Sequence, residues 1–392
     1  MRADADVVMS HIDSAGLICL AQEMVRIPSD NPPGREGQLA EFLCGYLRRI
    51  GLDAELREVA AGRPNVVARW GTAGARPHLI LNGHIDALPP GEGWTRNPYG
   101  GELFGGRLYG RGSTDMKGPL ASLIAAVDAV KRAGAKLRGS LTLEAVVDEE
   151  GGQEGTRRLV QEGVVGDFAL VGEPTEFLAV AAHKGDMHIE VVTHGREAHA
   201  STPRAGVNAI DQMADIIVEL CGLANRLHER AHPLVGSPTL SIGTIEGGLL
   251  TTMVPARCRI MVDRRVLPNE IAGDAVQQVR DAVDRVRGKH PGLHAEVRMV
   301  GFAPPMETAV DNPLVAAIRE ATLRVLGFDP GIHGWPATCD ANVLVNEGKT
   351  PTLVFGPGSI ADQAHKPDES VSTDELVAAA KIYALTILRL LA

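Results

Sequence analysis

Histidine and carboxylate side chains follow several apolar segments of this 392-residue chain. The segments that carry them are residues 81–86, 110–118, 146–151, 170–175 and 364–369. Open α/β sheets place their sites outside the carboxyl ends of the strands, so side chains from several strand ends can meet in one site. Imidazole nitrogens and carboxylate oxygens together suit divalent zinc, cobalt or manganese. No single segment specifies a metal site, but the five together are suited to a pair of divalent cations.

Spacing within these segments suggests roles for some of their residues. His84 and Asp86 lie two residues apart at a predicted strand end and can project to the same side, where Asp86 would hold the second imidazole nitrogen of His84. The alternative for His84 is a histidine bonded to backbone. Asp115 could equally be a helix cap. The acidic run 148–150 could be a solvated turn, although like charges at the end of an apolar strand favour a compensating cation.

A second histidine motif, His228-Glu229-Arg230-Ala231-His232, matches the H-E-x-x-H pattern of single-zinc proteases. In those enzymes both histidines project from one face of a continuing helix. Here Pro233 follows at once, which disfavours helical geometry at His232. We therefore do not assign a zinc site to this motif.

Apolar periodicity predicts the elements that must position these residues. Helical spacing is found at residues 15–26, 36–50, 117–133, 207–227, 271–286 and 314–326. Strand patterns are found at residues 65–70, 78–81, 141–147, 168–171, 187–192, 240–245, 258–262 and 351–355. In the first half, strands alternate with helices, which predicts an α/β domain with a mainly parallel sheet flanked by helices.

The pattern changes near Ala182 and changes back after Met299. Between these residues the predicted order is strand-helix-strand-strand-helix-strand, the order of an α+β ferredoxin-like domain. We expect residues 182–299 to be inserted into a catalytic domain made of residues 1–181 and 300–392. Two domains agree with the chain length, since single cores stop growing at about 250–300 residues.

Composition excludes several classes of function. The net charge is −10 and the basic residues are scattered, which argues against nucleic-acid binding. No apolar run approaches the ~20 residues that span a membrane. The five cysteines never form a Cys-x-x-Cys pair, and the first residues lead into no signal-peptide core. These observations predict a cytoplasmic protein without a disulfide framework.

The order and context of the five segments, together with residues 27–34, resemble those of the M20 metallopeptidase and deacylase family. This family includes acetylornithine deacetylase, succinyl-diaminopimelate desuccinylase, aminoacylase-1 and glutamate carboxypeptidases, and the resemblance spans nearly the whole chain. It implies two divalent metal ions, with zinc as our first choice and cobalt or manganese as alternatives. It implies the following ligands: His84 and Glu173 on one ion, Glu150 and His365 on the other, and Asp115 bridging them.

The resemblance also implies roles outside the ligand set. Glu149 would be the general base and Asp86 the partner of His84. The inserted domain would be a lid that mediates dimerisation, with His199 reaching the partner subunit's active site. The implied substrate contacts are His199, Arg265, Thr252 and Gly358. Relatives often carry asparagine at the position of Thr252. Because a threonine hydroxyl lacks the reach and the donor pair of that amide, the resemblance does not identify the substrate.

We therefore expect hydrolysis of the amide bond of N-acyl-L-amino acids by a metal-activated water, because two cations lower the pKa of a shared water to ~7. Glu149 would accept the proton of that water and return it to the leaving amine. The alternatives are an M20-type dipeptidase or carboxypeptidase, and a non-catalytic M20-like binding protein. The expected partners are a small N-acyl amino acid or short peptide and a second copy of the chain.

Overall fold

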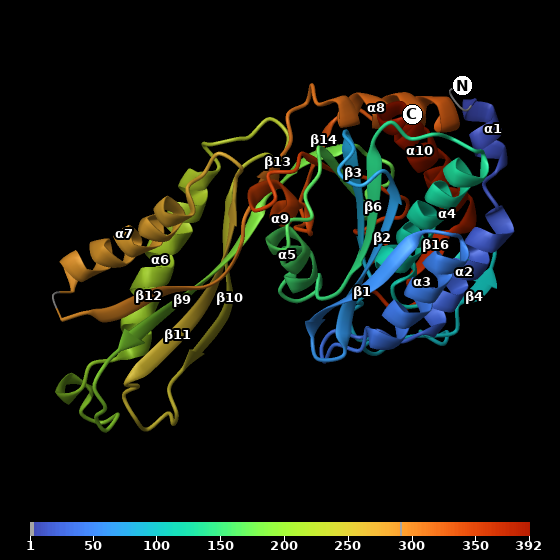
Figure 1. Cartoon of the computed structure of the whole chain (residues 1–392). Coiled ribbons are helices and arrows are strands. Elements are labelled where there is room, and N and C mark those ends of the chain that lie inside the picture. Colours follow the sequence, from blue (N-terminus) through green and yellow to red (C-terminus); the bar gives the residue numbers. More distant parts are fainter. Residues whose placement is uncertain (1–3, 291) are drawn as a thin grey trace. The chain divides into compact units, whose positions relative to one another are not determined.

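The computed structural model describes residues 4–290 and 292–392, which form two compact units (Figure 1). Of the described residues, the first unit holds those up to Ala181 together with 307–333 and 339–392. The second unit holds those of 182–306 together with 334–338. The second unit extends past Met299 to Met306 and also takes in the short segment 334–338.

The first unit is built on a large mixed sheet with the strand order β1-β2-β6-β3-β7-β15-β8-β13, and β14 pairs with β8. These strands are β1 Asp53–Ala60, β2 Arg63–Gly71, β3 His78–His84, β6 Ser140–Val146, β7 Phe168–Val171, β8 Val180–His183, β13 Met306–Glu307, β14 His333–Trp335 and β15 Thr352–Val354. The pairs β6–β3, β3–β7 and β7–β15 are parallel, while β1–β2, β2–β6 and β15–β8 are antiparallel. The predicted α/β class is confirmed, and parallel pairing forms the centre of the sheet.

The central strands are buried on both faces, as parallel strands covered by helices usually are. In β3 and β6 all residues after the first are buried. The covering helices include α4, Gly118–Arg132, and α10, Thr373–Leu391, which pack against each other and against β3. Apolar periodicity failed to predict α10, because its buried residues lie on more than one side and leave no single apolar stripe.

The remaining elements of this unit are shorter or lie at its surface. The helices are α1 Ala5–Ser10, α2 Ser14–Arg26, α3 Gly37–Arg49, α5 Glu154–Gln161, α8 Pro313–Leu326 and α9 Ala341–Asn346. A three-stranded sheet has the order β16-β5-β4, with β4 Glu102–Phe104, β5 Arg107–Tyr109 and β16 Ser370–Ser372. Among the described helices, none is both long and apolar enough to cross a membrane.

The second unit is an antiparallel sheet with the order β10-β11-β9-β12 and two helices. Its elements are β9 Gly185–His194, α6 Ala209–Leu227, β10 Thr239–Gly247, β11 Arg257–Val266, α7 Ala272–Lys289 and β12 His294–Ala303. Alternate residues of β9 and β11 pack with the apolar faces of α6 and α7 in one core. The predicted ferredoxin-like order of elements is confirmed.

Candidate metal centre

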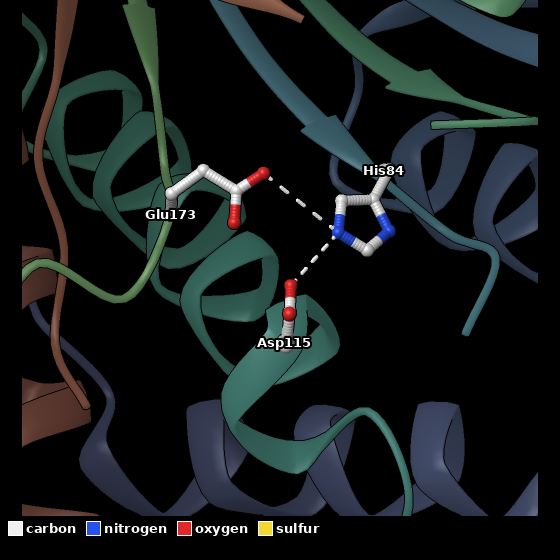
Figure 2. A group of neighbouring side chains, drawn as sticks. All are labelled: His84, Asp115 and Glu173. Carbon is white, nitrogen blue, oxygen red and sulfur yellow. Dashed lines mark hydrogen bonds and ion pairs between the residues drawn. The ribbon is translucent and has the colours of Figure 1, made fainter. Parts of the chain in front are cut away.

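His84 is the last residue of β3 and is 1% exposed. Its Nδ1 donates to the backbone carbonyl of Asp86 at 2.8 Å. This bond leaves Nε2 facing Asp115 Oδ1 at 3.0 Å and Glu173 Oε1 at 3.8 Å (Figure 2). An imidazole anchored through one nitrogen presents the other as a metal ligand of fixed orientation.

Asp115 faces two groups of ligand atoms. Its Oδ1 is turned to His84, while its Oδ2 lies 3.2 Å from Nε2 of His365. The same His365 nitrogen lies 3.0 Å from Glu150 Oε1. The two groups are therefore His84, Asp115 and Glu173, and Asp115, Glu150 and His365, with the ligand atoms in each within 4.8 Å of one another. The structure brings all five predicted ligands together around one shared carboxylate.

The electrostatics of this cluster suit bound cations. Burial raises the pKa of Glu173 well above its ordinary value, and the negative charge of Asp115 raises it further. Burial also raises the pKa of Glu150, and the charge of Asp115 opposes ionisation there too. Divalent cations between these carboxylates would offset both effects. Two imidazoles and three carboxylates fit zinc, cobalt or manganese, and a carboxylate that faces both groups could bind both ions of a two-metal site.

Asp86 holds the backbone of the acidic turn that follows β6. Its Oδ1 accepts from the backbone N–H of Glu149 and its Oδ2 from that of Glu150, both at 3.1 Å. Oδ2 also accepts from Asn31 Nδ2 at 2.9 Å. The carboxylate oxygen lies 3.5 Å from Nδ1 of His84, whose hydrogen bond goes to the Asp86 carbonyl instead. The predicted pairing with the imidazole is thus present as an ion pair, and the shorter contacts of the carboxylate hold the backbone of the two glutamates.

Glu149 lies beside the ligand cluster but belongs to neither ligand group. Burial raises its pKa well above the ordinary value, nearby His84 lowers it, and Glu173 raises it again. A carboxylate with a raised pKa next to a metal site is suited to accept and return a proton.

Glu369 joins two parts of the cluster, although sequence reasoning assigned it no role. Its Oε1 accepts from the backbone N–H groups of Thr114 at 2.9 Å and Asp115 at 3.1 Å, and its Oε2 accepts from Arg111 at 2.7 Å. Burial raises the pKa of Glu369 to about 7. The sequence does place Glu369 near the site, because it lies in the same short segment as His365, residues 364–369.

Gly358 lies next to the loop that carries Asp115. Its φ is +86°, in the left-handed region, and a Cβ atom there would lie 2.9 Å from Thr114 Cγ2. Its N–H donates to Glu375 at 3.2 Å. Both the backbone conformation and the close approach require glycine at this position.

The other predicted substrate contacts lie in the second unit. His199 and Thr252 come from adjacent segments, since Ala200 N–H donates to the Thr252 carbonyl at 2.9 Å. The imidazole of His199 contacts the Ser201 hydroxyl at 2.7 Å. Arg265 lies near the far end of β11, eight residues from its start, which is about 27 Å along a strand. The structure therefore brings His199 and Thr252 together and does not bring Arg265 to them.

Arg265 is already engaged by two carboxylates. Its guanidinium donates twice to Asp263, at 3.0 and 2.9 Å, and lies 3.3 Å from Asp186. A substrate carboxylate at this arginine would have to compete with both aspartates.

Replacing His228 by alanine is expected to leave the metal content of the purified protein unchanged. Helix α6 ends at Leu227, and residues 228–231 form no helix, so His228 and His232 do not share a helical face. Elemental analysis of wild type and variant checks this expectation. A loss of metal in the variant would restore the single-zinc protease interpretation.

Comparison with known proteins agrees with the predicted resemblance. The family model described as peptidase family M20/M25/M40 matches residues 80–389. An acetylornithine deacetylase of Edwardsiella ictaluri is 34% identical over 350 residues, which cover 87% of each protein. The chain belongs to peptidase family M20/M25/M40. It is accordingly an enzyme that acts on amide bonds.

Solved structures of this family share the fold. An aminopeptidase PepT of Bacillus cereus superposes with a TM-score of 0.81 at 22% identity, covering 97% of this chain and 99% of that one. An M20 metallo-carboxypeptidase of Sulfolobus solfataricus gives a TM-score of 0.80 at 20% identity, covering 95% and 98%. At such identities the likeness establishes the fold and leaves the substrate open.

Proposed function

We propose that this M20 enzyme hydrolyses the amide bond of N-acyl-L-amino acids, in the manner of an acetylornithine deacetylase or succinyl-diaminopimelate desuccinylase. The observation that carries the proposal is Asp115, whose two oxygens face separate ligand groups with Glu149 beside them. The 34% identity to a protein named acetylornithine deacetylase supports the acyl-amino-acid substrate class.

The proposed ligands are His84 and Glu173 for one ion, Glu150 and His365 for the other, and Asp115 for both, with zinc as the metal. Two such ions would supply Lewis acidity, which lowers the pKa of water in the site and polarises the amide carbonyl. Glu149 removes a proton from the attacking water. The water oxygen bonds to the carbonyl carbon, the C–N bond breaks, and Glu149 returns the proton to the leaving amine nitrogen. Asp86 keeps Glu149 in place through its backbone N–H.

We assign substrate contacts to His199, Thr252, Arg265 and Gly358 as part of this proposal. His199 of the partner subunit would stabilise the oxyanion that develops on the carbonyl oxygen. Arg265 would bind the carboxylate of the amino-acid product after exchanging one of its aspartate partners. All five cysteines are free, which supports the proposed cytoplasmic location.

We further propose that the second unit forms a homodimer through the edge of its sheet. Within the described residues β10 pairs only with β11, so the other side of β10 is an open edge. Apolar side chains are exposed on this strand and on α6, including Ile245 at 57% and Val218 at 70%. Open edges and exposed apolar groups of this kind are typical of association surfaces.

Hydrolysis of a substrate panel tests the proposed function. The panel holds N-acetyl, N-succinyl and N-formyl amino acids together with dipeptides, and each rate is measured before and after chelation and metal restoration. The proposal expects N-acyl amino acids to have the highest kcat/KM and chelation to abolish it. Preference for dipeptides would favour the peptidase alternative, and no turnover of any compound by metal-loaded protein would favour a binding protein.

Mixing inactive His199→Ala and Glu149→Ala subunits is expected to restore activity. In a two-fold dimer with shared sites, each mixed dimer has one complete site, so random exchange leaves roughly a quarter of all sites intact. The assay follows activity after exchange, with light scattering and a tagged subunit to show that mixed dimers formed. Mixed dimers without activity would show that each subunit completes its own site.

A further inference from the structure

Asn82 and Glu144 face each other across the centre of the main sheet. They are register partners in the parallel pair β3–β6, and neither side chain is exposed. Asn82 Nδ2 donates to Glu144 Oε2 at 3.1 Å and to the Thr156 hydroxyl at 3.0 Å. This contact joins the two strands that end at the metal centre, because His84 is the second residue after Asn82 and Glu149 follows β6.

Each residue of the pair has one buried oxygen atom that accepts no hydrogen bond from the part of the chain that the structure describes. Within the described residues, neither Asn82 Oδ1 nor Glu144 Oε1 has a hydrogen-bond partner, although both atoms are buried. If Glu144 were ionised, both atoms would be acceptors without a donor, and a negative charge would lie in the sheet. Buried polar groups are normally hydrogen-bonded, and a buried charge without a partner is more costly still.

We propose that Glu144 is a neutral carboxylic acid that forms a reciprocal pair with Asn82. The Asn82 amide donates to Glu144 Oε2, and the Glu144 hydroxyl donates to Asn82 Oδ1. One proton satisfies both orphan oxygens and removes the buried charge. Glu144 is therefore a positioning residue that aligns the ends of β3 and β6 and makes no contact with substrate.

The surroundings of Glu144 favour this neutral form. Burial raises its pKa to about 8, the Asn82 hydrogen bond lowers it, Asp340 before α9 raises it, and Arg57 on β1 and Arg69 on β2 lower it. The neighbours contributed by β3 and α5, Asn82 and Thr156, are uncharged. Both arginines donate hydrogen bonds to Glu55, so neither is paired with Glu144.

Glu144→Gln is the variant that tests the proposal, because glutamine keeps the shape, cannot ionise and carries a donor where the acid carries its hydroxyl. The folded protein must retain a proton that the unfolded chain releases near the ordinary pKa of 4.5. Wild-type stability therefore falls as the pH rises from about 4.5 to about 8, and this loss is absent from the variant. We expect the Tm of E144Q to rise relative to the Tm of wild type by several degrees between about pH 4.5 and pH 8. Above about pH 8 the difference in Tm is expected to stay constant.

Two further measurements complete the test, and neither needs a substrate. The infrared difference spectrum between wild type and E144Q at pH 7 is expected to show the carbonyl band of a neutral carboxylic acid. Glu144→Ala, which removes both hydrogen bonds of the pair and leaves Asn82 Oδ1 without a donor, is expected to lower Tm at every pH. Glu154→Gln on the exposed first turn of α5 serves as the matched surface control. A Tm difference independent of pH, no acid band, or E144Q as unstable as E144A would each overturn the proposal.

Discussion

Replacing Glu149 by glutamine is expected to lower kcat by ~10²- to 10⁴-fold, the range that general acid–base groups contribute. The amide has nearly the shape of the carboxylate but cannot accept a proton from the attacking water. Glu149 belongs to neither ligand group, so the variant is expected to keep its metal ions. Steady-state kinetics with the best substrate of the panel, combined with elemental analysis, checks both parts.

The matched control for this experiment is Glu154→Gln, five residues further along the chain and 59% exposed. This substitution removes the same charge at the surface and is expected to leave kcat within about two-fold of wild type, since surface changes are usually small. A Glu149→Gln enzyme with wild-type kcat would refute the assignment of the base. A variant that loses its metal ions would instead place Glu149 among the ligands.

Replacing Asp115 by asparagine is expected to remove metal from both positions at once. One oxygen of Asp115 faces the group containing His84 and the other faces the group containing His365. Loss of the charge leaves both ions with a weaker ligand set. The expected decrease in metal affinity exceeds ~100-fold, because even partners outside the coordination sphere account for ~10- to 100-fold. Titration of the metal-free protein with zinc measures the affinity and the number of ions.

His365→Ala is the informative comparison, because this histidine belongs to one group only. It is expected to lose one of the two ions and to keep the other. The melting temperature of each metal-free variant shows whether the protein still folds. An Asp115→Asn protein that binds two ions as tightly as wild type would contradict a shared carboxylate and would reduce the site to two independent groups.

Much of the metal centre could be predicted from the chain itself. His84 and Glu173 each follow an apolar segment that is predicted to be a strand. The carboxyl ends of parallel strands lie at the same edge of a sheet, so the sequence pattern predicts that these two side chains lie close together. The contribution of Asp115 could not be derived in this way. It depends on a loop that turns at Gly112, with φ 80°, and on Glu369, which holds the loop from 254 residues away in the sequence.

Asp86 shows the same limit. Its spacing from His84 predicts two neighbouring side chains, but β3 ends at His84, so strand alternation does not say which other groups the Asp86 carboxylate reaches. The carboxylate lies 3.5 Å from Nδ1 of His84, and it also accepts from the N–H groups of Glu149 and Glu150, which lie 63 and 64 residues away in the sequence. Which donor a buried carboxylate finds is decided by the packing of segments distant in the chain.

The sequence by itself determined the class of this protein: an α/β domain, a ferredoxin-like order of elements after Ala182, and histidine and carboxylate side chains at segment ends that are suited to bind metal ions. These features depend on local periodicity and on residue type, which a chain carries wherever it folds. Only the tertiary structure decided that Glu369 holds the loop of Asp115, that Arg265 lies against Asp186, and that Glu144 faces Asn82 inside the sheet. Each of these is a contact between residues far apart in sequence, and its partner is set by which polar groups the packing of distant segments brings together.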